Sequence, residues 1–185
     1  MASSETVVFI AGSYVDAASA KYDFRAVRDS YYETNALEEF DCAVLGRQDT
    51  GKVKIFRKFE RSTLHGGLVG PGWGLATGLA VALFPAAAIG TNFLVGTPGG
   101  HGGVSAFAGQ VAAGVGRKDL LATGAMFDSA QAGLIAAATE AIAPLVRSAM
   151  NGVDEVLIVE ALIDTDELAR NIREAYREAI AQSPR

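Results

Sequence analysis

Apolar residues recur with strand or helix periodicity along most of the chain, and in the N-terminal part this pattern predicts a strand followed by a helix. Residues 6–11 (TVVFIA) are rich in β-branched side chains and end at Gly12-Ser13, which predicts a short strand. Asp16 can then cap a helix that runs to about Tyr32. The apolar residues on one side of that helix recur at spacings of three and four: Ala20, Phe24, Val27 and Tyr31.

A β-hairpin is predicted next. Residues 40–47 (FDCAVLGR) and 52–59 (KVKIFRKF) both have strand character, and the second run alternates apolar with charged side chains. Asp49, Thr50 and Gly51 lie between the two runs and are typical turn-forming residues.

The C-terminal part repeats the strand–helix–strand order and ends in another helix. Thr139 can cap the helix of this unit, and Asn151-Gly152 can stop it. Residues 164–167 (DTDE) have the form of a capping box for the last helix. The predicted elements are a short helix at 120–127, strands at 132–138 and 155–163, a helix with Ile142, Leu145, Val146 and Met150 on one face, and a last helix at 168–181.

This order of elements predicts an α+β protein with a ferredoxin-like α/β sandwich, βαββ…βαβα. Residues 1–61 and 119–185 would form one discontinuous α/β domain, into which residues 62–118 are inserted as a glycine- and alanine-rich helical hairpin. Both faces of the strand at 155–163 carry apolar residues, while helices normally cover one face of such a sheet. The second face therefore needs a cover, which the inserted block or another subunit can supply.

The inserted block has a period of its own. Gly66, Gly70, Gly74 and Gly78 recur every four residues, and no Asp, Glu, Lys or Arg occurs from Gly66 to Gly116. On a helix this spacing forms one smooth side against which another backbone can lie closely. Small residues continue the same period at Ala82, Ala86 and Gly90.

Two arms are predicted within the block. Pro71 and Pro85 limit or kink helices in the first arm, residues 97–100 (TPGG) form a break, and residues 104–115 can form a second helix. An interior glycine costs a helix about 0.5–1 kcal/mol relative to alanine, so close packing has to return that energy. Because the second arm is shorter than the first, part of the glycine side would stay uncovered, and we predict a homo-oligomer. Its interface is predicted to contain Gly66, Gly70, Gly74, Gly78 and Trp73.

Composition narrows the classes of partner. The 185 residues are 50% hydrophobic and 20% charged, which suits one domain with a substantial core. The net charge of −5 argues against a nucleic-acid partner. Cys42 is the single cysteine, so no internal disulfide forms and a reducing, cytoplasmic compartment is expected. The N-terminal segment lacks a basic region before its apolar run, so no signal peptide is expected.

No set of residues forms a recognisable catalytic, cofactor-binding or metal-binding signature. His65 and His101 adjoin glycines, but neither has a carboxylate or thiol near it in the sequence. Cys42 lies within a predicted strand and lacks an evident activating base. The loop at 96–103 could present backbone amides to an anion, yet it lacks the lysine of a phosphate-binding loop. We therefore expect no catalytic residue, no cofactor and no metal ligand.

Basic residues flank the block and have two interpretations. A membrane hairpin with both ends in the cytoplasm would carry such residues on either side. A solvated strand edge that discourages aggregation would carry them too. The second arm is too short for a span of about 20 residues, so we expect that the block does not cross a bilayer as two helices. The basic residues are Lys52, Lys54, Arg57, Lys58 and Arg61 before the block, and Arg117 and Lys118 after it.

The order of these segments resembles a family of uncharacterised bacterial proteins. The resemblance lies in FDCAVLGRQDTGKVKIFRKFE, the glycine run HGGLVGPGWGLATGLAVALFPAAAIG, and the later segments AGLIAAATEAIAPLVRSAM and EVLIVEALI. Members of that family are described as predicted membrane or stress-related proteins with a central glycine-zipper hairpin. The resemblance supplies no catalytic signature that could be carried over to this chain.

Three functional hypotheses follow. The first is a non-enzymatic, self-associating structural or stress-related protein whose glycine-zipper hairpin mediates homo-oligomer assembly. The second is a membrane-associated protein that inserts the hairpin, and the third is a small-ligand-binding ferredoxin-like oligomer. The expected location is the cytoplasm, with a peripheral contact to the inner membrane as an alternative.

Overall fold

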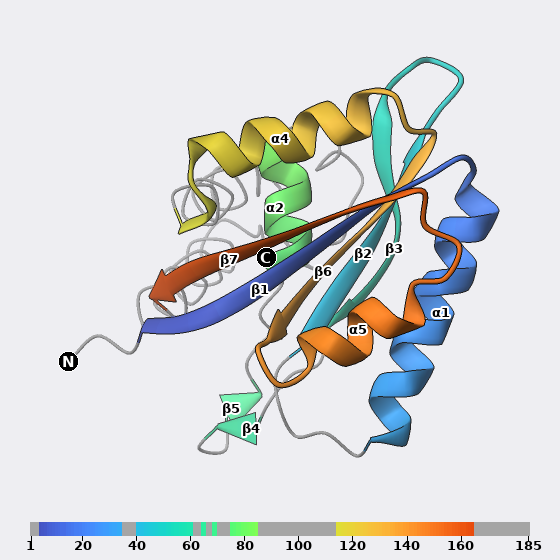
Figure 1. Cartoon of the computed structure of the whole chain (residues 1–185). Coiled ribbons are helices and arrows are strands. Elements are labelled where there is room, and N and C mark those ends of the chain that lie inside the picture. The colour runs from blue at the N-terminus through green and yellow to red at the C-terminus, as the bar shows by residue number, and fades with distance from the viewer. Residues whose placement is uncertain are drawn as a thin grey trace, which may run out of the picture.

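The structure, a computed structural model, describes residues 4–34, 40–60, 64–65, 68–69, 75–84 and 114–164 (Figure 1). Five strands of this part form one sheet in the order β3-β2-β6-β1-β7, and each neighbouring pair is antiparallel. Strands β3 and β7 are therefore the two edges (Figure 1). The strands of this sheet are β1 (Ser4–Tyr14), β2 (Phe40–Arg47), β3 (Val53–Glu60), β6 (Ala132–Thr139) and β7 (Glu155–Asp164).

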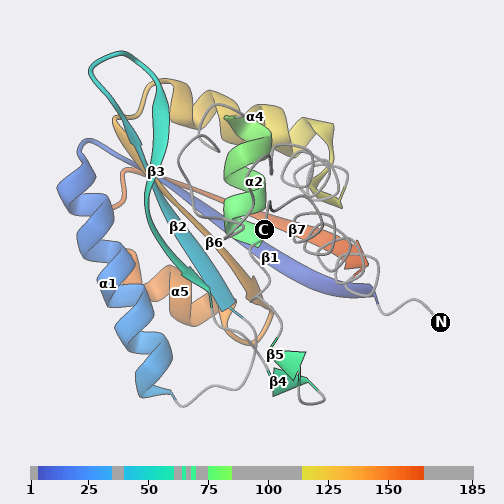
Figure 2. The same cartoon turned by 180° about the vertical axis from the view of Figure 1, so that it is seen from behind.

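Helices cover both faces of this sheet, as the opposite views of Figures 1 and 2 show. Helices α1 (Ala17–Glu33) and α5 (Ala143–Ala149) pack on one face. Helices α2 (Leu75–Leu83) and α4 (Arg117–Asp128) pack on the other. A separate pair of two-residue strands, β4 (Leu64–His65) and β5 (Leu68–Val69), precedes α2.

The predicted α+β class is confirmed, and so is the second layer of packing. Apolar residues do face both sides of the sheet, because alternate positions of the central strands belong to two separate buried clusters. The second face is covered from within the chain, by α4 and by α2, which lies in the glycine-rich block.

Several local predictions are confirmed by the contacts that carry them. The Oδ1 atom of Asp16 accepts a hydrogen bond of 2.7 Å from the Ser19 amide at the start of α1. The predicted side of that helix is buried. In the hairpin, Gly51 has φ of 80°, a left-handed conformation that favours glycine. A bulge between Val44 and Leu45 then shifts the pairing of β2 with β3.

Two sequence predictions about element ends are wrong. Strand β1 does not end at Gly12-Ser13 but continues to Tyr14, with Gly12 paired to both neighbouring strands. This glycine serves close packing, because a Cβ atom there would overlap Met150 and Val153. Thr139 does not cap the next helix.

Thr139 instead ends β6, and its backbone carbonyl accepts a hydrogen bond of 3.1 Å from the Ile142 amide. Helix α5 begins only at Ala143, and Ile142 at its N-cap makes no side-chain cap. The tight turn after β6 therefore displaces the helix start, although the predicted apolar side of the helix still faces the core. The last helix predicted at 168–181 and most of the second arm at 104–115 lie outside the described residues.

Candidate association site

A buried aspartate joins the glycine-rich block to the sheet. Asp41 lies on β2 with 1% of its surface exposed, and its carboxylate reaches the N-terminus of α2. Its Oδ2 atom accepts a hydrogen bond of 2.9 Å from the Leu75 amide, and its Oδ1 atom accepts one of 2.6 Å from the Ala76 amide. Both donors belong to the first turn, whose amides have no partner within the helix. The negative carboxylate also suits the positive end of the helix dipole.

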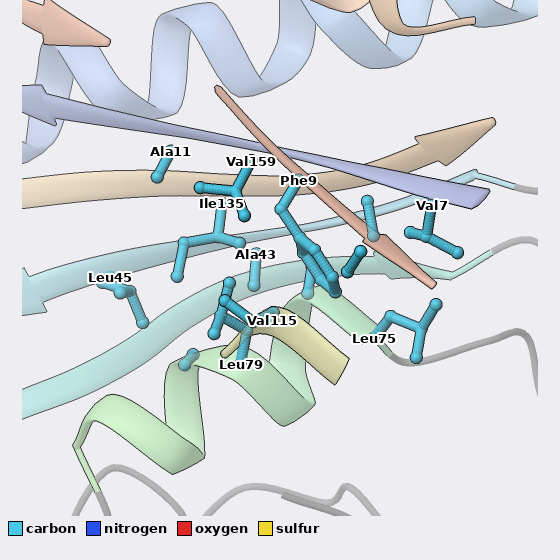
Figure 3. Close-up of a cluster of buried hydrophobic side chains, with 14 of the residues drawn as sticks. Val7, Phe9, Ala11, Ala43, Leu45, Leu75, Leu79, Val115, Ile135 and Val159 are labelled. Carbon is cyan, nitrogen blue, oxygen red and sulfur yellow. The ribbon is translucent and has the colours of Figure 1, made fainter. Parts of the chain in front are cut away.

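Apolar contacts fix the same helix against the sheet. Leu75, Ala76, Leu79 and Ala80 of α2 are each at most 1% exposed. They belong to one cluster with Phe9 of β1 and residues of the other strands, and Figure 3 shows Leu75 and Leu79 directed toward the strands. The alanines keep the backbone of the helix close to the sheet. The position of α2 on the sheet and its rotation about its own axis are therefore set both by the hydrogen bonds to Asp41 and by apolar packing.

This rotation places the glycine side of α2 away from the strands. At 100° per residue, Gly78 lies about 130° around the helix axis from the centre of the buried side. The sheet contact of α2 thus uses leucine and alanine rather than the predicted glycine period. Gly66, Gly70, Gly74 and Trp73 lie outside the described residues. The prediction that the period from Gly66 to Gly78 runs along one helix is wrong, because Leu68–Val69 is a strand and α2 begins only at Leu75.

Helix α4 closes the other end of the same layer. The rings of Phe84, which follows α2, and Phe127 of α4 have centroids 6.1 Å apart. Phe127 lies over Gly133 of β6, where a Cβ atom would overlap its ring. Gly133 therefore lets the Phe127 ring lie close to the strand backbone, and α2 and α4 form one layer.

A second buried aspartate serves the opposite layer. Asp23 of α1 is fully buried, and its Oδ2 atom accepts hydrogen bonds from the Tyr14 hydroxyl (3.0 Å) and the Gly152 amide (2.9 Å). Burial, and then the adjacent Asp23 carboxylate, raise the pKa of Tyr14 well above its usual range. The hydroxyl therefore remains a hydrogen-bond donor at ordinary pH. This cluster ties α1 to the turn before β7.

Cys42 is placed where its thiol has little reactivity. Its side chain is 1% exposed between β2 and the α1 layer. Burial, and then the charge of Asp41, raise the pKa of the Cys42 thiol well above its usual value. Because the thiolate is the reactive form, this environment is that of a core residue. Of the two histidines, His65 lies in β4 and His101 outside the described residues.

Sequence reasoning missed Asp41, although a signal was present. A carboxylate between Phe40 and Cys42 in a buried strand needs hydrogen-bond donors, because an unpaired buried charge is very costly. The missing information was the location of the donors, which lie 34 and 35 positions away.

Comparison of the chain with family models, with curated proteins and with solved structures gives no match. In the part of the chain that the structure describes, no helix has the length and apolar character needed to cross a membrane. Over the same residues, no group of three or more histidine, cysteine, aspartate or glutamate side chains is arranged to hold a metal ion.

Proposed function

We propose that this chain is a non-enzymatic, self-associating protein of a structural or stress-related kind. In the assembly, the glycine side of α2 packs against the same side of α2 in a second copy. The observation that carries the proposal is the anchoring of α2 by Asp41 and by its buried leucines and alanines. Because these leucines and alanines face the sheet, helix periodicity puts Gly78 on another side of α2.

The energetics of α2 favour a packing role for its glycine. An interior glycine costs a helix about 1 kcal/mol relative to alanine, and α2 has only nine residues. Small residues let two helix backbones approach closely, so that dispersion contacts can offset this cost. A contact between identical surfaces has two-fold symmetry and closes as a dimer.

We also propose a ferredoxin-like fold and a cytoplasmic location for this protein. The strand order β7-β1-β6-β2, with α1 and α5 on one face, supports a ferredoxin-like arrangement to which β3 adds an edge strand. In this view the glycine-rich block is inserted between β3 and β6, as in the glycine-zipper proteins that the sequence resembles. We place the protein in the cytoplasm, with the inner-membrane surface as an alternative partner of the block.

Gly78→Leu is expected to abolish the two-fold contact between α2 helices and so to lower the mass of the assembly in solution. The leucine side chain blocks close approach of a second helix, while α2 itself gains up to about 0.8–1 kcal/mol of helix propensity. Ala18→Leu is the matched control, because it adds a leucine to an exposed position of α1. Light scattering after size-exclusion chromatography measures both. An unchanged mass for Gly78→Leu would contradict the proposal.

A further inference from the structure

The two edges of the sheet carry opposite charge. Glu155 and Glu160 are exposed on β7, and no lysine or arginine occurs in that strand. Lys54 and Arg57 are exposed on β3 at the other edge. Lys21 of α1 adds to the basic edge.

Both edges also expose apolar side chains. Ile158 and Leu162 of β7 are 53% and 65% exposed, and Phe56 of β3 is 40% exposed. In the described part of the chain, β7 pairs only with β1 and β3 only with β2, so each edge leaves backbone groups on its outer side.

These side chains lie on the same face of the sheet. Ile158 pairs with Ile10, which packs in the cluster under α1 and α5, and Leu162 is four positions further along the same strand. Phe56 lies beside α1, with Lys21 Nζ 5.1 Å from its ring centroid.

Glu160 pairs with Val8 and Arg57 with Val44, and both partners belong to the same cluster under α1 and α5, so each edge presents a charged group beside its apolar groups on the α1 face. Glu155 lies on the opposite face of β7.

Strand direction is compatible with an edge-to-edge contact between copies. Because every neighbouring pair in the order β3-β2-β6-β1-β7 is antiparallel, β3 and β7 run in the same direction. A second copy placed beside the first, with the same face up, would bring its β3 parallel to the β7 of the first. In the register that sets Glu160 beside Lys54 and Arg57 of the second copy, Ile158 and Leu162 lie on either side of its Phe56.

We propose that the β7 edge docks onto the β3 edge of a second copy of this chain, adding a strand to the sheet. The occupant is a second copy because its β3 edge complements the charge and the apolar side chains of β7. This contact is head-to-tail, so it repeats from copy to copy and forms a ring or an open chain. It uses neither α2 nor the glycine period, and it is independent of the function proposed above.

The alternative is that the charges keep the edges apart. Charged side chains on an edge strand are a common means of preventing edge-to-edge pairing. If the charges only protect the edges, the wild-type edges do not associate, and reversing the charge of one edge does not weaken association. Two variants with complementary edges then do not bind each other.

The test uses two charge-reversed chains, both carrying Gly78→Leu so that the glycine contact does not add to the signal. One chain carries Glu155→Lys with Glu160→Lys, and the other carries Lys54→Glu with Arg57→Glu. All four positions are exposed, and circular dichroism with thermal unfolding checks that each variant folds. Sedimentation velocity measures each chain alone and in an equal mixture, at about 0.02 M and about 1 M salt.

Each reversed chain alone is expected to self-associate about tenfold or more weakly than the parent at low salt, because like charges then face each other. The equal mixture is expected to form assemblies in which the two chains alternate at 1:1 stoichiometry, because the reversed β7 edge meets the reversed β3 edge and the two unchanged edges also meet. High salt is expected to reduce these differences, because the screening length falls to about 3 Å at 1 M. Lys118→Glu with Asp128→Lys, two exposed positions on α4, is the matched control and should behave as the parent. Equal association of all chains, or a mixture no heavier than its components, would overturn the proposal.

Discussion

Asp41→Ala is expected to lower the free energy of unfolding by about 2–4 kcal/mol. The substitution removes two charge-assisted hydrogen bonds and leaves the amides of Leu75 and Ala76 buried without their acceptor. Hydrogen bonds to charged groups contribute about 1.5–3 kcal/mol each, and the released cost of burying the charge offsets part of that loss. The effect is measured by denaturant unfolding.

Two further substitutions test whether the loss of stability comes from the hydrogen bonds between Asp41 and the N-terminus of α2. Asp41→Asn keeps one accepting oxygen and is expected to cost about half as much. Asp16→Ala removes the exposed local cap of α1 and is expected to cost about 1 kcal/mol. Hydrogen exchange of the Leu75 and Ala76 amides should accelerate in Asp41→Ala and should not change in Asp16→Ala. Unchanged protection of these two amides would show that Asp41 does not hold α2.

Leu79→Ala is expected to destabilise the protein by about 2–5 kcal/mol, because it opens a cavity between α2 and the sheet. Leu79 is 1% exposed and packs in the cluster that includes Phe9 and Ile135. Leu121→Ala on α4 is the matched control, since the same substitution at a side chain that is 64% exposed should change stability by less than about 0.5 kcal/mol. Equal effects of the two substitutions would mean that α2 does not cover this face in solution.

Local features of this fold could be predicted from the sequence because their causes are local. Asp16 and its donor Ser19 are three positions apart, and the hairpin depends on Gly51 between two alternating runs. Apolar residues on both faces of β7 indicated that the sheet needs cover on its second face. The structure places Val159 and the alternate residues Ala161 and Ile163 of that strand under the α2 and α4 layer.

Features that depend on distant residues could not be predicted. The sequence indicated that Gly12 ends a strand. The structure shows that glycine is needed at this position because Met150 and Val153 leave no room for a Cβ atom. Asp41 accepts from amides that only the completed fold brings near. The expectation of cover on both faces of β7 holds for one face, whereas Ile158 and Leu162 on the other are exposed. Which positions an edge leaves exposed depends on helix placement, and periodicity does not specify it.

The rotation of α2 likewise changed the interpretation of the glycine period. The sequence could indicate that small residues make a smooth side, but not what that side faces. The structure shows that Ala76 and Ala80 are buried in the contact with the sheet, and helix periodicity then puts Gly78 on another side of the helix. The association proposal therefore rests on the orientation of α2 rather than on glycine spacing alone.

Disulfide cross-linking at position 78 tests the proposed association most directly. In a Cys42→Ala background, Gly78→Cys places a single thiol on the glycine side of α2, and Ala18→Cys places one on the exposed side of α1. A disulfide needs Cα atoms about 4.4–6.8 Å apart, a separation that closely packed helices related by a two-fold axis provide. Under mild oxidation we expect a covalent dimer for Gly78→Cys and none for Ala18→Cys. A Gly78→Cys chain that remains monomeric under oxidation, or dimers formed equally by both variants, would contradict the proposed association.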